Sequence, residues 1–254
     1  MEMPALLYPG RKPVGNVEID WNNPIAKDLK SVEVFHLTSG AHLLDGSIGS
    51  LRAGTGNIIA PDREGLALIG GSDTDDGLEF GVSSVSPISL HNESSLTLLF
   101  VMRLVENFTV EAGIFVERPA GSGTGISVTV PAADALRCLI ATTGTSIWTA
   151  AQDEDITSFL GKYCVVGMTY DGSNRHVYIG EVGGPISLLR SDACTGTVNI
   201  ASYATIATPV IGGGLTDNVF GQGSIYSGII SRKCLSSSQV DAYCRNPYQF
   251  LVPA

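Results

Sequence analysis

Glycine spacing is the feature of this sequence that most narrows its fold. Thirty glycines divide the 254 residues into many short runs rich in β-branched and aromatic side chains. Short runs of this kind, each ending at turn-forming residues, are typical of sandwiches and barrels. Helical periodicity is almost absent before the last twenty residues. The chain is therefore predicted to be all-β, and one large domain is favoured over two small ones.

Ten segments are expected to be strands. They are Val32–Leu37, Gly65–Ile69, Leu78–Val82, Leu96–Val105, Gly113–Glu117, Ile126–Val130, Leu136–Ala141, Cys164–Tyr170, His176–Ile179 and Ile225–Ser231. The clearest local unit is the hairpin Lys162–Gly180, because Asp171-Gly172 supplies residues that tolerate positive φ between two β-forming runs. We expect its strands to lie in the middle of a sheet.

A short helix is expected near the end of the chain, over about Ser237–Arg245. Ser236 and Gln239 have the spacing of a capping box, and Leu235 and Val240 have that of a hydrophobic staple. Asn246-Pro247 stops the helix, because the residue before a proline is disfavoured in helical geometry.

The first thirty residues differ from the rest. Pro4, Pro9, Pro13 and Pro24 rule out a continuous helix or a central strand there. Residues 1–30 are therefore predicted to form an extended arm that precedes a sandwich over residues 31–254. Two roles for the arm stay open: it docks onto an acidic neighbour, or it packs along its own domain.

Charge and cysteine content exclude several classes of protein. With 15 basic and 25 acidic residues the net charge is −10, which disfavours nucleic acid and anionic membranes as partners. No apolar run reaches the roughly 20 residues of a membrane-spanning helix, and no signal-peptide pattern opens the chain. Five cysteines without a Cys-x-x-Cys pair are expected to be buried, reduced thiols.

Four blocks of sequence, in the same order, resemble laminin-G-like domains. They are Glu64–Leu68 with the acidic glycine loop after it, Ser95–Arg103, the hairpin Cys164–Gly172 with Val177–Gly180, and the closing segment Gly223–Ser236 with Gln239-Val240 and Asn246-Pro247. The resemblance spans roughly residues 64 to 253. It implies a concanavalin A-like fold of the lectin and glucanase superfamily: a two-sheet antiparallel jelly-roll sandwich with a short C-terminal helix. Such folds host lectins, hydrolases, adhesion modules and decoration proteins alike.

A second resemblance concerns the leader. The stretch Pro9–Gly15, continued through Ile19–Pro24, looks like the leader that precedes such domains in virion proteins of tailed bacteriophages. It implies that Pro9, Arg11, Lys12, Pro13 and Trp21 belong to an assembly arm.

The acidic residues of the leader do not complete the catalytic set of a glucanase. Glucanases of this fold place three acids on one central strand, of which one attacks the sugar and another protonates the leaving group. Glu18 and Asp20 match the first two positions, but Asn22 and Asn23 stand where the third should fall. Pro24 then closes a segment that ought to be a central strand. We therefore expect a polar leader strand and no enzyme.

The acidic loop Asp73–Gly77 is the candidate metal site. Asp73, Asp75 and Asp76 place three carboxylates within one turn, which suits the oxygen coordination of calcium, although the EF-hand spacing is not met. A solvated acidic turn is the alternative. The four histidines lie far apart in the sequence and give zinc little support. No other cofactor is expected.

Aromatic side chains in predicted loops are the candidate ligand-binding residues. Sugars stack their apolar face on tryptophan or tyrosine, and Trp148, Tyr203 and Phe220 lie near predicted loops. With two tryptophans and 7% aromatics, packing is the commoner explanation for each of them.

The sequence thus predicts a virion structural or capsid-decoration protein of a tailed bacteriophage, attached through its N-terminal arm and assembled in the host cytoplasm. Its expected partners are other virion proteins and further copies of itself. The alternative is a carbohydrate-binding adhesin of the tail-fibre type that recognises host glycans through loops at one end of the sandwich.

Overall fold

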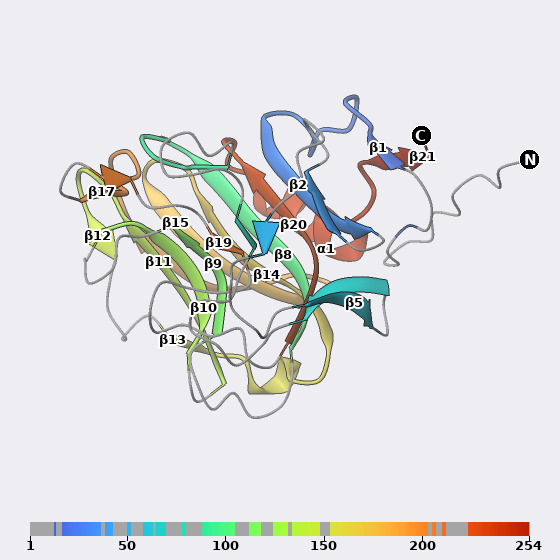
Figure 1. The fold of residues 1–254 in the computed structure, drawn as a ribbon. Coiled ribbons are helices and arrows are strands. Elements are labelled where there is room, and N and C mark those ends of the chain that lie inside the picture. The colour runs from blue at the N-terminus through green and yellow to red at the C-terminus, as the bar shows by residue number, and fades with distance from the viewer. Residues whose placement is uncertain are drawn as a thin grey trace, which may run out of the picture.

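The fold is a sandwich of two antiparallel sheets with an α-helix on its outer side (Figure 1). The computed structural model describes residues 13, 17–36, 39–42, 50–51, 58–62, 65–69, 78–79, 88–104, 112–117, 124–131, 134–147, 153–202, 205–206, 210–211 and 223–253. The predicted all-β, two-layer architecture is confirmed for these residues.

One layer is a nine-stranded sheet in the order β16-β15-β14-β8-β20-β2-β3, with β6 also on β20 and β5 on β6. Its strands are β2 (Leu29–His36), β3 (Ser39–His42), β5 (Ile58–Asp62), β6 (Gly65–Ile69), β8 (Leu96–Leu104), β14 (Tyr163–Tyr170), β15 (Asn174–Glu181), β16 (Ser187–Ala193) and β20 (Gly223–Ser231).

The other layer is an eight-stranded sheet in the order β12-β11-β10-β9-β19-β7-β4, with β13 also on β11. Its strands are β4 (Ser50–Leu51), β7 (Leu78–Glu79), β9 (Ala112–Glu117), β10 (Ile126–Val130), β11 (Ala135–Ala141), β12 (Ser146–Ile147), β13 (Asp153–Asp155) and β19 (Val210–Ile211). Two small ribbons pair β1 (Val17–Ile19) with β21 (Leu251–Pro253) and β17 (Ala201–Ser202) with β18 (Thr205–Ile206).

Strand β8 is apolar along most of its length because both of its faces are buried. Successive residues of a strand point to opposite faces of the sheet. Leu98 and Phe100 point into the space between the two sheets, whereas Leu99 and Val101 point to the outer face. Both faces are covered, so no position of β8 faces water until Arg103. The hairpin of β14 and β15 was predicted correctly, and Gly172 at its tip has φ of 90°.

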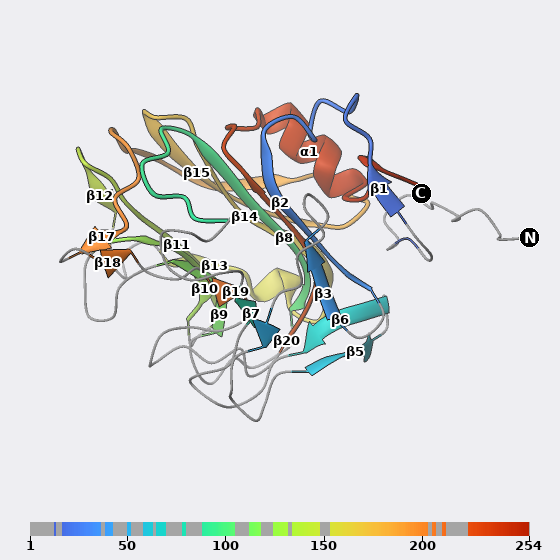
Figure 2. The same cartoon turned by 45° about the horizontal axis from the view of Figure 1, so that its top comes forward.

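The outer face of the nine-stranded sheet is covered by the helix α1 (Ser237–Arg245) and by both ends of the described chain. Figure 2 shows α1 and the eight-stranded sheet on opposite sides of the nine-stranded sheet. The predicted capping box of Ser236 and Gln239 is present, and Leu235 and Val240 are buried. A short 3-10 helix, Thr157–Phe159, precedes β14.

Residues 17–29 form a strap along this outer face. Ile19, Ile25, Ala26 and Leu29 are buried in the same cluster as Tyr243 of α1. Their backbone is tied down as well, because the Asp20 N–H donates to the Phe250 carbonyl at 2.8 Å. This part of the predicted arm therefore packs along its own domain. Residues 1–12 and 14–16 lie outside the described residues.

All five cysteines are described, and none is in a disulfide. Four are buried, as expected, and Cys234 is half-buried. The described part of the chain contains no helix that is both long and apolar enough to cross a bilayer.

Candidate functional site

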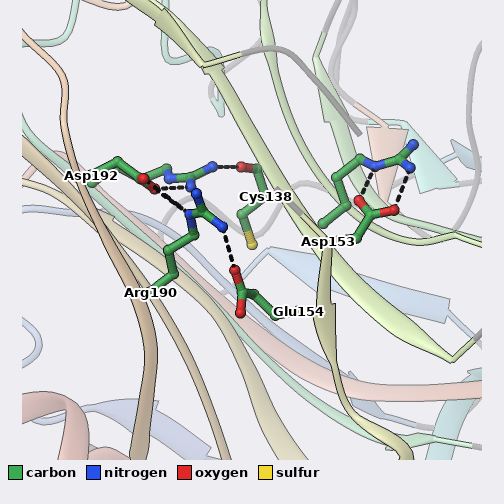
Figure 3. Close-up of polar contacts among 7 residues, drawn as sticks. Cys138, Asp153, Glu154, Arg190 and Asp192 are labelled. Atoms are coloured by element: carbon green, nitrogen blue, oxygen red, sulfur yellow. Dashed lines mark hydrogen bonds and ion pairs between the residues drawn. The ribbon is translucent and has the colours of Figure 1, made fainter. Parts of the chain in front are cut away.

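A cluster of charged side chains lies along one edge of the sandwich, between β15 and β16 of one sheet and β11 and β13 of the other (Figure 3). The Arg175 guanidinium is completely buried and bridges the two sheets by donating to the Cys138 carbonyl of β11 and to the Asp192 carboxylate of β16. Arg190 donates to both oxygens of Asp192 at 3.0 Å and to Glu154 of β13 at 2.9 Å.

A further pair lies beside this cluster, between Arg137 and Asp153, with nitrogen to oxygen distances of 2.5 and 2.7 Å. We call the six side chains the edge network: Arg137, Asp153, Glu154, Arg175, Arg190 and Asp192. It holds three positive and three negative groups, so its charges balance. Its contacts join the two sheets across the open edge of the sandwich.

Protonation in the edge network follows from these contacts. Burial alone raises the pKa of Asp192, but hydrogen bonds from Arg190 and Arg175 outweigh burial and hold the pKa below its ordinary value. Hydrogen bonds to Glu154 and Asp192 raise the pKa of Arg190. These groups stay charged near neutrality, which suits a structural role better than proton transfer.

A polar surface lies at one end of the sandwich, the end at which Figures 1 and 2 show β12 and β17. Two Thr-Gly-Thr segments pair there in antiparallel fashion. The Thr143 N–H donates to the Thr197 carbonyl at 2.9 Å, and the Thr145 N–H donates to the Thr195 carbonyl at 3.2 Å. We call Thr143, Thr145, Thr195 and Thr197 the threonine platform.

The platform has a rigid backbone. The Thr142 hydroxyl lies within hydrogen-bonding distance of the carbonyl oxygens of Thr145 and Thr195, and the buried Tyr170 donates its hydroxyl to the Gly196 carbonyl at 2.5 Å. A Cβ at Gly144 would lie 2.5 Å from the Thr195 carbonyl oxygen, and one at Gly196 would lie 2.6 Å from the Thr143 hydroxyl. Gly196 also has φ of 107°, so both glycines are required for the close approach.

The hydroxyls of the platform retain capacity to bind a ligand. Those of Thr143 and Thr197 are 3.5 Å apart, and those of Thr145 and Thr195 are 3.4 Å apart. Both separations are long for hydrogen bonds between hydroxyls. Thr143, Thr145 and Thr195 are exposed and Thr197 is half-buried. Each hydroxyl can donate and accept, so the array suits a ligand that itself carries hydroxyl groups.

A buried acid lies in the sandwich interior near this end. Glu117, the last residue of β9, is fully buried and accepts a hydrogen bond from the Leu90 N–H at 2.9 Å. Burial raises its pKa to about 8, although the Ser89 hydroxyl, the Leu90 N–H and the charge of Lys30 each lower it. Among the described residues, no group of three or more His, Cys, Asp or Glu side chains is arranged to hold a metal ion.

Most of the site residues predicted from the sequence lie outside the part of the chain that the structure describes. Asp73, Asp75 and Asp76 lie outside the described residues, as do Trp148, Tyr203 and Phe220, and so do Pro9, Arg11 and Lys12.

Two residues of the predicted assembly arm are described. Pro13 is buried, and Trp21 is 59% exposed in the turn after β1. That turn is ordered by its own side chains, because Asp20 accepts from the Asn22 N–H and Asn23 accepts from the Ile25 N–H, each at 2.9 Å.

The acids considered for catalysis lie on the small ribbon of β1 and β21. Glu18 is exposed on β1, which forms a two-stranded ribbon with β21 in the described part of the chain. A glucanase mechanism needs these acids on a central strand of the sandwich, which is not where they lie.

Sequence reasoning missed both the edge network and the threonine platform. The acidic run of Asp153 and Glu154 is indistinguishable in the sequence from solvated surface charge, but each of the two is paired with an arginine. The signal for the platform was present in the sequence as two copies of Thr-Gly-Thr, at Thr143–Thr145 and Thr195–Thr197.

Solved structures confirm the fold. No protein-family model matches this sequence, and none of the curated proteins matches it. The binding domain of botulinum neurotoxin DC in complex with SialylT matches 87% of this chain and 52% of its own, with 15% identity and a TM-score of 0.58. The binding domain of Paraclostridial Mosquitocidal Protein 1 matches 85% of this chain and 52% of its own, with 16% identity and a TM-score of 0.59.

A Trypanosoma rangeli sialidase in complex with sialic acid also matches 87% of this chain and 33% of its own, with 12% identity and a TM-score of 0.54. The chain thus spans about half of the binding domains and a third of the sialidase. At these identities the likeness concerns the fold alone, which is a jelly-roll sandwich of the concanavalin A-like kind.

Proposed function

We propose that this chain is a non-catalytic binding module that recognises glycans through the threonine platform. The observation that carries the proposal is the exposed, backbone-locked array of hydroxyls at one end of the sandwich. Sugar hydroxyls are donors and acceptors like those of threonine, and a preformed array loses little entropy on binding. The fold supports the proposal, because similar sandwiches occur in a toxin binding domain in complex with SialylT and in a sialidase in complex with sialic acid.

A glycan array followed by titration tests this function. The wild-type chain is expected to bind a subset of glycans, and Thr145→Val with Thr195→Val to weaken binding about tenfold or more, since valine keeps the shape and removes the hydroxyls. Thr157→Val is the matched control, an exposed threonine in the 3-10 helix before β14. Absence of binding to any glycan, or equal weakening by the control, contradicts the proposal.

We further infer that the module belongs to a virion of a tailed bacteriophage, as a structural or decoration protein that attaches through its N-terminal leader. The support is the likeness of the leader to those of virion proteins together with the exposed Trp21 beside it. Because residues 17–29 are built into the core, attachment is assigned to the residues before Val17 and to Trp21. Many identical weak contacts on a particle add through multivalency.

Charge reversal of the leader tests attachment without removing any core residue. Arg11→Glu with Lys12→Glu is expected to abolish co-purification of the full-length chain with phage particles, because the leader is predicted to dock on an acidic neighbour. Lys27→Glu is the control, an exposed lysine within the strap. Mass spectrometry of purified particles gives the readout. Unchanged incorporation of the double variant, or absence of the wild-type chain from particles, contradicts the inference.

A further inference from the structure

Glu117 points into the space between the two sheets. Alternation along β9 places it on the same face as Phe115, whose ring stacks on Phe100 of the opposite sheet with centroids 6.1 Å apart. Glu117 is fully buried, and Ile126 is its partner on the neighbouring strand. A carboxylate in such surroundings is costly unless donors satisfy both of its oxygens.

Direct hydrogen bonds satisfy the two oxygens unequally, although the nearby Ser89 hydroxyl also lowers the pKa of Glu117. The Leu90 N–H donates to Oε2 at 2.9 Å, whereas Oε1 is buried with no hydrogen-bond partner. The nearby cation, Lys30, is engaged elsewhere: its ammonium donates to the Ser89 carbonyl and pairs with Glu93, each at 2.7 Å. A neutral carboxylic acid fits this environment better than a carboxylate.

The partner of Glu117 belongs to a segment that leads to the threonine platform. Within residues 88–93, which we call the latch segment, the Asn92 N–H donates to the Val198 carbonyl and the Val198 N–H donates to the Glu93 carbonyl, both at 2.9 Å. Val198 directly follows Thr197 of the platform. Hydrogen bonds thus link Glu117 to the latch segment, and the latch segment to Val198, the residue next to the platform.

We propose that Glu117 is a proton-operated latch, which holds the latch segment and the Thr195–Thr197 side of the platform in place while protonated and releases them when it ionises. Ionisation strengthens the bond from the Leu90 N–H, but it also places a negative charge in the sandwich interior while Oε1 has no donor. Movement of the segment then admits the water that Oε1 needs. The consequence for glycans rests on the proposed function, whereas the movement itself does not.

The electrostatics support the latch. Burial raises the pKa of Glu117 to about 8, so the acid is mainly protonated at neutral pH and ionises in mildly alkaline solution. Among the described residues, the charged group that acts on Glu117 is Lys30 from β2, and Lys30 itself pairs with Glu93 of the latch segment. Strand β10 contributes the apolar Ile126 opposite Glu117.

Amide chemical shifts measured between about pH 6 and pH 10 test the latch in the full chain. In the wild type, the amides of Leu90, Val198 and Thr197 are expected to titrate together with a midpoint near 8. Glu117→Gln, which mimics the protonated acid, is expected to abolish that transition. Glu18→Gln, which changes an exposed acid on β1 outside the latch segment, is the control and is expected to keep it.

Three results would overturn the latch: a transition that survives in Glu117→Gln, one that disappears in Glu18→Gln, or one confined to Leu90. Infrared spectroscopy of the wild type adds a measurement that needs no variant. It is expected to show a buried protonated carboxylic acid at neutral pH that is lost as the pH rises through about 8, and its absence would refute the proposal.

Glycan affinity separates this inference from the proposed function. If the platform binds glycans, affinity is expected to fall about fivefold or more as Glu117 ionises, and to stay level in Glu117→Gln. A level wild-type affinity would refute the link between latch and platform. If no glycan binds, the proposed function fails while the amide titration still decides whether the latch exists.

Discussion

The edge network and Glu117 bury ionisable groups in opposite ways. In the edge network the fully buried Arg175 lies between the Cys138 carbonyl and the Asp192 carboxylate, and Arg190 pairs with both Asp192 and Glu154. Glu117 is equally buried but has one satisfied oxygen and one without a partner. Pairing preserves charge in the first region, whereas protonation removes it in the second.

The difference shows what each region is suited to do. A network of paired charges fixes the geometry of two sheets, and its hydrogen bonds hold the pKa of Asp192 below and that of Arg190 above the ordinary value. The buried acid Glu117 is sensitive to pH in mildly alkaline solution, because its pKa of about 8 lies well above that of an ordinary surface carboxylate. The first region therefore suits a structural role, and the second suits regulation.

Removal of Arg175 is expected to have the largest effect. Arg175→Met leaves Asp192 without its buried partner and the Cys138 carbonyl without its donor. The free energy of unfolding is expected to fall by about 3–5 kcal/mol. Urea denaturation at neutral pH measures it, and a loss below about 1 kcal/mol would show that the network does not hold the sheets together.

The pH dependence of stability is expected to show the contribution of Glu117. Its pKa in the fold, about 8, lies above the ordinary value of 4.5. Its contribution is therefore complete below about pH 4.5 and is lost as the pH rises through about 8. At pH 9, Glu117→Gln is expected to be more stable than the wild type by on the order of 2–4 kcal/mol. Thermal unfolding across pH measures this, and parallel curves for the two proteins would refute it.

Arg190 is expected to have a smaller effect, because its side chain is 32% exposed. Arg190→Gln is expected to cost about 1 kcal/mol at neutral pH. It also removes a donor that lowers the pKa of Asp192. The stability contributed by ionised Asp192 is lost as the pH falls through its folded pKa, so acid unfolding of the variant is expected to begin at higher pH. Identical acid unfolding curves would contradict this.

The smallest effect is expected at an exposed ion pair. Arg245 on α1 pairs with Asp241 at 2.8 Å on the surface, one helical turn away. Because water screens both groups, Arg245→Gln is expected to leave the urea midpoint unchanged. If Arg245→Gln shifted the urea midpoint as much as Arg190→Gln does, burial of an ion pair would not determine how much its loss destabilises the fold.

Local sequence signals predicted much of the fold. Asp171-Gly172 predicted the hairpin of β14 and β15, and the spacing of Ser236 and Gln239 predicted α1 with its bounds. Strand β8 was found because its run of apolar side chains is covered on both faces. In each case the determinant is a few residues that are adjacent or nearly adjacent in the chain.

The functional features depend on contacts between distant residues, which local patterns do not encode. Arg175 and Cys138 are 37 residues apart, and Leu90 and Glu117 are 27 residues apart. The exposed edge strand β16 carries polar and charged residues and was not predicted for that reason. Burial of Glu117 follows from the packing of β9 against the other sheet, which its own neighbours in sequence do not specify.

A structure of the chain with its tightest glycan from the array tests the central claim most directly. We predict the intact sugar bound against Thr143, Thr145, Thr195 and Thr197, with its hydroxyls paired to theirs. A glycan bound at the opposite end of the sandwich, or one cleaved by the protein, would contradict a non-catalytic binding module that acts through the threonine platform.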